Sequence, residues 1–493
     1  MYRIRTALLL TALTLALSGC SRQSEEPTSP AAAVPAPAPV REVVSNLLLI
    51  CVDTVRADTF YSLGERRDDR LQAWQDDALV FHQAQSPAPW TVPALGSAFS
   101  GLWPIQHRAG QLPGATHVSV MLSRPGLMRK DTDTIAMAAR NAGMATNVVS
   151  SSGWTFEAIN GVGINHGFSE FHKFAPSLET LGDVYWEPMV DKWEDMISAQ
   201  EQDERALNFV HFIEAHNWHL VTAAELDERI ATFSAEQRAD YRATAPERAC
   251  ADEASLMCRR YLVYAHAVGV LRDAVANMLD TLKSSGQLDN TAVVLFSDHG
   301  EEFNDHIGDG REDSKYRQEV FFGHGQSLYQ EQLRVPLVVW HPSEEGRAID
   351  TPVSLVDIAP SAAHWLGLEL IAPDMAGELL HEQPGHGTAE RVLYASNIGA
   401  GEIQVAARRG DVKSIWYIPS DRTAFYDLVQ DPAELHSTPS NALVLEFDGY
   451  FLEHSQLQPK DESEAAKFTE SQLKRLQSIG YLQGVDNAEA EEE

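Results

Sequence analysis

An acid, an imidazole and a glycine follow one another in Ser297-Asp298-His299-Gly300-Glu301-Glu302. The motif comes directly after the apolar, β-branched run of residues 291–296, which predicts a buried strand of a parallel sheet. The end of such a strand is where α/β proteins place their chemistry. Asp298 and His299 are residue types that ligate metal ions, and Gly300 lets the backbone approach a ligand closely. Taken alone, the same tripeptide is more often a turn that caps a helix.

A second acid, Asp53, follows the apolar run of residues 46–52. That run also predicts a buried strand, so Asp53 is expected at the same edge of the sheet. In isolation, Asp53 would be better explained as the cap of the following turn.

A hydroxyl group comes from Thr91 in Pro89-Trp90-Thr91-Val92-Pro93. Pro93 suits the first turn of a helix through residues 94–100, which puts Thr91 at the helix N-terminus. The simple interpretation is that Thr91 is an N-cap. In the functional interpretation, the positive end of the helix and a nearby metal ion activate this hydroxyl for attack on phosphorus or sulfur.

An imidazole lies between two glycines in Phe322-Gly323-His324-Gly325, just before the run Leu333 to Leu337. This setting fits a loop that brings His324 close to a ligand, where it would protonate a leaving oxygen. A surface-loop histidine without a task is an equally good interpretation of this residue on its own.

The elements that must position these residues alternate between strand-like and helical patterns. We expect an α/β fold with a large, mostly parallel central sheet and helices on both faces. Past about residue 385, short runs separated by turns predict a small antiparallel sheet. The expected strands cover residues 46–52, 145–150, 207–213, 291–296 and 335–340, then 391–395, 403–407, 414–418 and 424–428. The expected helices cover residues 133–142, 260–285, 356–368 and 471–482.

Taken together and in order, these segments resemble the sulfatase family of the alkaline phosphatase superfamily. The resemblance includes Asn46 to Asp58, Trp90 to Pro93, Ser297 to Glu302 and His324 to Leu337, and it extends over nearly all of residues 46–482. Further similarities are Glu214-Ala215-His216, Val356 to Pro360, Phe425 to Leu428 with Asp431 to Glu434, and Ile479 to Leu482. The resemblance implies an alkaline phosphatase-like fold, and it gives His216 a place facing the substrate.

The chain departs from this family at the position of the nucleophile. Sulfatases carry a Cys or Ser that becomes formylglycine, within a Cys-x-Pro-Ser-Arg pattern; here the run is Thr91-Val92-Pro93-Ala94-Leu95. A threonine cannot become formylglycine, and it resembles the nucleophile of phosphodiesterases, phosphatases and phospho-head-group transferases of the superfamily. Thr54 replaces one of the acids that usually bind calcium.

The resulting hypothesis is one divalent cation held by Asp53, Thr91, Asp298 and His299. A nitrogen ligand favours Mn or Zn over Ca. Thr91 would also be the nucleophile, and His324 or His216 would donate a proton to the leaving group. A second ion would have to use His216, His219 and His324, which lack an acidic partner at a convincing spacing.

The N-terminus predicts export. Residues 1–20 combine Arg3 and Arg5 with a short apolar core and end in the lipobox-like Leu17-Ser18-Gly19-Cys20, so Cys20 is expected to carry a lipid. Ordinary secretion without lipidation is the alternative. Ser21 after the cysteine favours the outer membrane, and we expect a bacterial, periplasmic or cell-surface location.

The expected organisation is a signal peptide (1–20), a Pro/Ala-rich tether (21–44), a catalytic domain (45–385), a C-terminal small-sheet subdomain with a closing helix (386–485) and an acidic tail (486–493). The formal net charge of −33 argues against a nucleic-acid partner. An oxidising compartment would allow Cys250 and Cys258 to pair, although their spacing does not require it.

Four functions are considered from these observations. The leading hypothesis is a metal-dependent hydrolase of phosphate monoesters or diesters, and sulfate-ester hydrolysis without formylglycine is the alternative of the same class. A catalytically inactive, sulfatase-like binding lipoprotein is the alternative of a different class. A transferase of phospho-head groups ranks lower, because such enzymes usually carry several transmembrane helices and the sequence has none.

Overall fold

The computed structural model describes residues 43–67, 69–110, 126–152, 161–174, 186–201, 203–306, 323–370, 374–385, 391–397, 404–417 and 422–438, with Leu443 and Glu446. The chain divides into a unit of residues Met1–Val40 and a unit of residues Arg41–Glu493. The first unit, with the signal segment and Cys20, lies outside the described residues. So do nearly all of the tether, the expected helix 471–482 and the acidic tail.

The centre of the second unit is an eight-stranded sheet in the order β5-β4-β6-β1-β7-β8-β2-β9. Strands β5, β4, β6, β1 and β7 are parallel, β8 is antiparallel to both β7 and β2, and β9 is parallel to β2. The strands are β1 (Asn46–Val52), β2 (Leu79–Phe81), β4 (Ala145–Ser150), β5 (Glu170–Lys173), β6 (Ala206–Phe212), β7 (Thr291–Phe296), β8 (Leu337–Trp340) and β9 (Arg347–Ile349). The mostly parallel sheet predicted from the sequence is confirmed.

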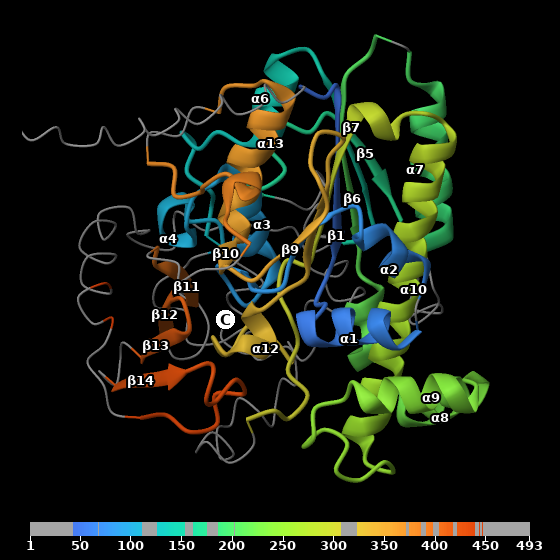
Figure 1. The fold of residues 1–493 in the computed structure, drawn as a ribbon, viewed down its shortest axis with the longest axis vertical. Coiled ribbons are helices and arrows are strands. Elements are labelled where there is room, and N and C mark those ends of the chain that lie inside the picture. The colour runs from blue at the N-terminus through green and yellow to red at the C-terminus, as the bar shows by residue number, and fades with distance from the viewer. Residues whose placement is uncertain are drawn as a thin grey trace, which may run out of the picture. The chain divides into compact units, whose positions relative to one another are not determined.

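Helices cover both faces of this sheet (Figure 1). Leu47, Leu49 and Cys51 of β1 pack in one core with α3, α6 and α13, whereas the alternate residues Leu48 and Ile50 pack in a second core with α1, α7 and α10. Because both faces are buried, the strand reads as a continuous apolar run. The helices are α1 (Ala57–Arg67), α2 (Arg70–Gln75), α3 (Thr91–Ser100), α4 (Pro104–His107), α6 (Ile135–Asn141), α7 (Trp186–Ala199), α10 (Leu256–Ser284), α12 (Gln330–Leu333) and α13 (Ile358–Leu366).

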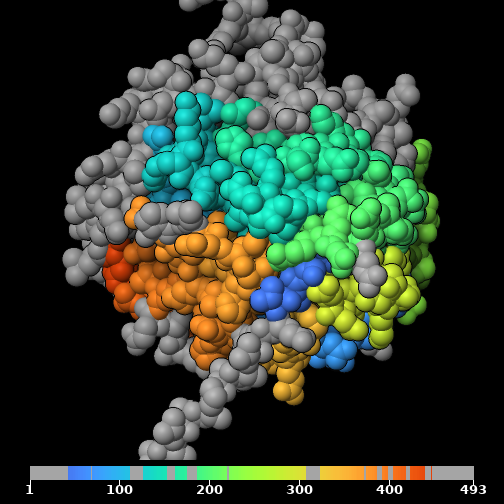
Figure 2. All heavy atoms as spheres, turned by 90° about the horizontal axis from the view of Figure 1, so that it is seen from above, coloured from blue at the N-terminus to red at the C-terminus, as the bar shows by residue number. Residues whose placement is uncertain are grey.

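Because they run parallel, β1, β4, β5, β6 and β7 all begin at one end of the sheet, and Figure 2 views the surface that carries the first described residues. There the first described residues, in blue, reach the surface, and Ser45 and Asn46 bond to the segments that lead into β7 and β6. The carboxyl ends of β1, β6 and β7 therefore meet at the opposite end.

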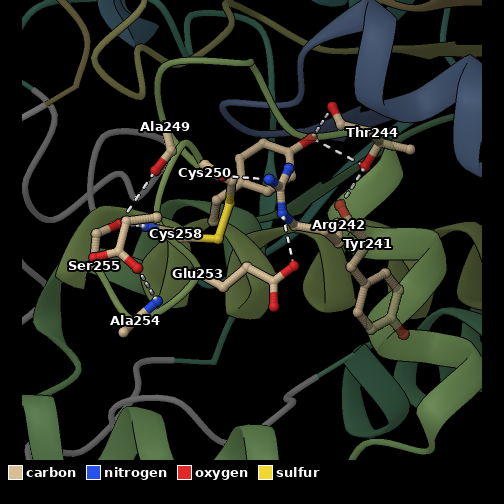
Figure 3. Close-up of a disulfide and its surroundings, with 11 residues drawn as sticks. Tyr241, Arg242, Thr244, Ala249, Cys250, Glu253, Ala254, Ser255 and Cys258 are labelled. Carbon is tan, nitrogen blue, oxygen red and sulfur yellow. Dashed lines mark hydrogen bonds and ion pairs between the residues drawn. A yellow bond between two sulfur atoms is a disulfide. The ribbon is translucent and has the colours of Figure 1, made fainter.

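An insertion between β6 and α10 lies at the end of the unit that also carries α1 (Figure 1). It contains the 3₁₀ helix η2 (Glu214–Leu220) and the helices α8 (Ala223–Thr232) and α9 (Ala235–Ala243). Cys250 and Cys258 form a disulfide that joins the end of this insertion to the first turn of α10 (Figure 3). Arg242 of α9 bonds to the Cys250 carbonyl oxygen and pairs with Glu253 beside it.

The C-terminal part is a four-stranded antiparallel sheet, as the sequence predicted. Its strands are β11 (Leu393–Asn397), β12 (Gln404–Arg409), β13 (Val412–Tyr417) and β14 (Arg422–Asp427). Ala406 and Ile415 pack on Leu328, Tyr329 and Leu333, around and within α12. Smaller elements are β3 (Ala84–Gln85), β10 (Val353–Ser354), η3 (Leu288–Asn290), η4 (Leu355–Asp357) and η5 (Leu380–Glu382).

Within the described ranges, no helix combines the length and the apolar character needed to cross a bilayer.

Candidate active site

The candidate site lies at the carboxyl ends of two neighbouring strands. Asp53 follows β1, and Asp298 and His299 come just after β7, which pairs with β1 in parallel register. The N-terminus of α3 supplies Thr91 to the same place. All four side chains are buried.

The four residues meet around one atom, Nε2 of His299. It lies 3.4 Å from Thr91 Oγ1, 3.5 Å from Asp53 Oδ1 and 3.4 Å from Asp298 Oδ2. The structure therefore brings together the hydroxyl, the two carboxylates and the imidazole named from the sequence. Chain positions as distant as 53 and 299 share a single buried space.

These donors fit a divalent cation. Nδ1 of His299 lies 2.9 Å from the carbonyl oxygen of Gly300, which accepts only, so Nδ1 carries the proton and Nε2 presents a lone pair. Asp298 Oδ2 is buried and accepts no hydrogen bond from a described residue. One ligand atom each from Asp53, Asp298 and His299 lies within 4.8 Å of the others. Two carboxylates and one imidazole form a donor set for Mn or Zn.

Electrostatics also favour a cation here. Burial, followed by the neighbouring Asp53 carboxylate, raises the pKa of Asp298. Burial would raise the pKa of Asp53 too, but the hydrogen bond from His211 and its charge, with the nearby His216 and His299, lower it below its usual range. Two like charges enclosed in this way need a compensating positive charge.

His211 is a functional residue that the sequence analysis missed. It lies on β6 opposite Cys51 of β1, and its Nε2 donates to Asp53 Oδ2 over 3.0 Å. A bond of this kind orients a metal-ligating carboxylate. The sequence feature that could have pointed to His211 is a single histidine in the mostly apolar strand Ala206–Phe212.

Thr91 is the first residue of α3 and not its cap. The N-cap is Trp90, which makes no side-chain capping bond, so the interpretation of Thr91 as a plain N-cap is wrong. Pro93 takes the third helical position, where a missing N–H costs no intrahelical bond. The Thr91 hydroxyl therefore lies at the positive end of the helix dipole.

Thr54, at the position of the second family acid, does not enter the site through its side chain. Its hydroxyl donates to the carbonyl oxygen of Asp53 over 2.7 Å, while its backbone N–H points at Asp298 Oδ1 from 3.4 Å. Its φ of 63° is costly for a β-branched residue. The strained turn directs a backbone donor toward the carboxylate of Asp298.

His324 and His216 lie beside the four residues. The His324 ring centroid is 4.5 Å from that of His299 and 5.1 Å from that of His216. His324 Nδ1 lies 3.1 Å from the buried carboxylate of Glu301, another residue that the sequence analysis did not assign to the site, although it belongs to the Asp-His-Gly motif. Burial alone would lower the pKa of His324, but the charge and hydrogen bond of Glu301 raise it.

The described residues offer two groups of three metal-ligand side chains. They are Asp53/Asp298/His299 and Cys51/His211/Asp298, and neither includes His216 or His324. In the second group, His211 is already bonded to Asp53. The side chain of His219 lies outside the described set.

Comparison with known proteins identifies the family of this chain. The family model described as Sulfatase matches residues 45–368, more than half of the chain. The chain belongs to the sulfatase family. The members of this family are ester hydrolases of the alkaline phosphatase superfamily that use a divalent metal.

Individual relatives of this sulfatase-family chain are distant. It is 28% identical to the choline-sulfatase of Rhizobium meliloti (strain 1021) over 179 residues, which are 35% of this chain and 32% of that protein. The chain thus aligns with about a third or less of the length of the curated relatives it matches.

Solved structures share the fold over most of the chain. The phosphonate monoester hydrolase of Agrobacterium radiobacter superposes with a TM-score of 0.58 at 16% identity, covering 86% of this chain and 100% of that one. A putative sulfatase from Bacteroides thetaiotaomicron VPI-5482 gives a TM-score of 0.59 at 15% identity, with coverages of 87% and 96%.

Proposed function

We propose that this sulfatase-family protein hydrolyses phosphate monoesters or diesters with Thr91 as its nucleophile. The observation that carries the proposal is the position of the Thr91 hydroxyl. Its oxygen lies 3.4 Å from His299 Nε2, in the buried space that Asp53 and Asp298 share. A threonine cannot supply the formylglycine of other family members, whereas a hydroxyl is itself a nucleophile.

In this proposal, Asp53, Asp298, His299 and Thr91 would hold one divalent cation, Mn or Zn. The ion would supply positive charge that favours the deprotonated hydroxyl and stabilises the non-bridging oxygens of the ester. Thr91 Oγ1 bonds to phosphorus as the bond to the leaving oxygen breaks, and the hydroxyl proton passes to solvent. His324 donates a proton to that oxygen, with His216 beside it. Water then attacks the phosphorus of the phosphothreonine, and one of its protons restores the Thr91 hydroxyl. The product released is phosphate from a monoester and a phosphate monoester from a diester.

Sulfate-ester hydrolysis is the second candidate. Its support is the family model and the likeness to a choline-sulfatase, whose printed name gives a sulfate ester as its substrate. Sulfate and phosphate esters present similar tetrahedral oxyanions, so the same residues would serve either reaction.

We further propose that the protein acts from the periplasmic or cell-surface side of a bacterial membrane, attached through Cys20. The support is the lipobox-like Leu17-Ser18-Gly19-Cys20 and the Pro/Ala-rich residues after it. Metabolic labelling with a fatty-acid analogue tests this proposal, because Cys20→Ala should abolish both the label and membrane recovery.

The activity is tested with chromogenic phosphate monoesters, phosphate diesters and sulfate esters, each assayed with Mn, Zn and Ca. We expect Thr91→Ala to lower kcat by at least roughly a thousandfold, because the covalent route is lost. Thr91→Ser is the matched control and should retain activity, because it keeps the hydroxyl. Activity unchanged in Thr91→Ala would refute the nucleophile. A parent protein that binds no Mn or Zn and cleaves no ester would support the inactive binding protein instead.

A further inference from the structure

Glu301 has an enclosed carboxylate in the loop that carries the metal ligands. Its side chain is buried, and its backbone N–H donates to the Glu331 carbonyl oxygen over 2.9 Å. The sequence analysis gave this residue no role. Glu301 contacts Nδ1 of His324, whose ring also lies 4.5 Å from the ring of His299.

Three donors converge on this carboxylate. His324 Nδ1 lies 3.2 Å from Oε1 and 3.1 Å from Oε2, Trp218 Nε1 lies 3.0 Å from Oε2, and the Glu302 backbone nitrogen lies 3.3 Å from Oε1. The indole N–H can only donate, so Oε2 must accept from it. A carboxylate can satisfy both side chains because both of its oxygens are acceptors.

Trp218 is itself fixed in place. Its ring is 2% exposed, and it lies 4.9 Å from the ring of Phe303 and 5.6 Å from the guanidinium of Arg260. A rigid aromatic donor defines where Glu301 Oε2 can lie, so the carboxylate has little freedom to follow a moving histidine.

The backbone at Gly323 is shaped to admit this carboxylate. A Cβ at position 323 would lie 2.1 Å from Glu301 Oε1 and 2.5 Å from the Glu302 carbonyl oxygen. The Gly323 carbonyl in turn accepts from the Glu302 N–H over 2.6 Å. The glycine before His324 is therefore explained by the close approach of two loops, which clamps His324 onto Glu301.

We propose that Glu301 is a positioning residue for ester cleavage. It binds Nδ1 of His324 and thereby turns Nε2 of that ring toward the leaving oxygen. Trp218 holds the Glu301 carboxylate in place through its indole N–H. The inference rests on the proposed function and deepens it, because it assigns the leaving-group side of the site to Trp218, Glu301 and His324. Glu301 acts through the histidine and does not touch the substrate.

The experiment is a leaving-group series. Aryl esters of the type that the parent cleaves, from 2,4-dinitrophenyl to unsubstituted phenyl, are assayed with the metal-loaded, full-length protein. Poor leaving groups need a proton from His324, whereas 2,4-dinitrophenolate leaves without one. We expect Glu301→Gln to lower kcat about 10- to 100-fold on phenyl esters and less than about threefold on dinitrophenyl esters, with KM nearly unchanged.

The amide is a sharp probe because it is nearly isosteric but has one acceptor and one donor. With its oxygen at the Oε2 position it can still accept from Trp218, but its NH₂ group then replaces Oε1, which accepts from His324 Nδ1 and from the Glu302 N–H, and the negative charge beside His324 is lost. Glu302→Gln, which changes the neighbouring carboxylate, is the matched control and should behave like the parent. Thermal melting of each variant verifies folding. If Glu301→Gln does not fold, Trp218→Phe is used instead, because it removes one donor to Glu301. It should also lower kcat more on phenyl esters than on dinitrophenyl esters, but by a smaller factor.

A double-variant comparison completes the test. If Glu301 acts through His324, then Glu301→Gln combined with His324→Gln should be no slower than His324→Gln alone. Equal losses on all leaving groups, or losses that multiply in the double variant, would overturn the positioning role. Those outcomes leave the proposed function intact as long as Thr91→Ala is inactive. Full activity of Thr91→Ala would instead remove the proposed function itself.

Discussion

Asp53 is an enclosed carboxylate that the imidazole of His211 helps to orient. His211 Nε2 reaches Asp53 Oδ2, which leaves Oδ1 on the side of His299. Such a contact fixes the direction of a metal ligand and helps offset the cost of its burial. In the proposed site, His211 would thus contribute both to stability and to the affinity for the ion.

Replacing His211 should therefore weaken metal binding. We expect His211→Ala to raise the dissociation constant for Mn or Zn by about 10- to 100-fold, because Asp53 loses its orienting donor. Titration of the metal-free protein by calorimetry measures this change. His364→Ala is the control, since His364 is an exposed histidine on α13. An unchanged affinity in His211→Ala would show that Asp53 is held by other contacts.

At the scale of single residues, the sequence located the candidate metal ligands better than the side chains that hold them in place. Asp53, Asp298 and His299 follow apolar strands, so their places at a sheet edge could be inferred from pattern alone. The contact between His211 and Asp53 spans 158 residues and depends on the pairing of β6 with β1. No local pattern encodes that pairing. The role of Glu301 likewise depends on Trp218 of η2 and on His324 of the loop before α12.

The loop after β7 forms a short ladder with α12. Gly300 N–H donates to the Gln332 carbonyl oxygen over 2.8 Å, and Ser297 N–H donates to the Pro336 carbonyl oxygen over 3.2 Å. The described residues that follow β7 and those that precede β8 thus lie together at the carboxyl end of β7. A strand that re-enters from that end must run antiparallel to β7, which explains the direction of β8. The sequence predicted a strand at residues 335–340 but could not give its direction.

Gly300 lies so close to α12 that any side chain at this position would disturb the contact between the loop and the helix. A Cβ at position 300 would lie 2.1 Å from the Glu331 carbonyl oxygen, which is backbone and cannot turn away. We expect Gly300→Ala to destabilise the protein by about 1–3 kcal/mol and to weaken metal binding, because His299 must shift with the loop. Gly385→Ala is the matched control, since its nearest atom would be 3.4 Å away.

Urea unfolding and metal titration of the two glycine variants measure these effects. Wild-type stability and affinity in Gly300→Ala would mean that the loop can move away from α12 without cost. Loss of stability in both variants would point to a general effect of replacing glycine.

At the scale of the whole unit, the C-terminal sheet reaches the active-site loop through buried charges. Lys413 of β13 pairs with Glu434 over 2.8 Å, and Glu434 Oε2 accepts from the Gln330 backbone N–H over 2.6 Å. His306, at the end of the described active-site loop, bonds to Glu331 over 3.1 Å. The resemblance to sulfatases pointed to the segment of residues 425–434, but only the structure shows that it braces α12.

His306 makes this contact sensitive to pH. Its ring stacks on Tyr329 with centroids 3.7 Å apart, and the carboxylates that act on it are Glu331, Glu302 and Glu434. Burial alone would lower the pKa of His306, but the charge and hydrogen bond of Glu331, followed by Glu302 and Glu434, raise it to about 9. His306 therefore binds a proton more tightly in the folded protein than in the unfolded chain, where a histidine has a pKa of about 6.5.

The direction in which stability changes with pH follows from this difference between the folded and unfolded pKa of His306. The contribution of His306 to stability is complete below about pH 6.5, declines as the pH rises, and is lost above about pH 9. Urea unfolding of the parent and of His306→Gln should differ by up to about 3 kcal/mol at pH 6, and this gap should shrink at pH 10. Other groups that titrate between these values cancel in the comparison, because both proteins carry them. An equal gap at pH 6 and pH 10 would mean that His306 stabilises the junction by packing on Tyr329 and not by its charge.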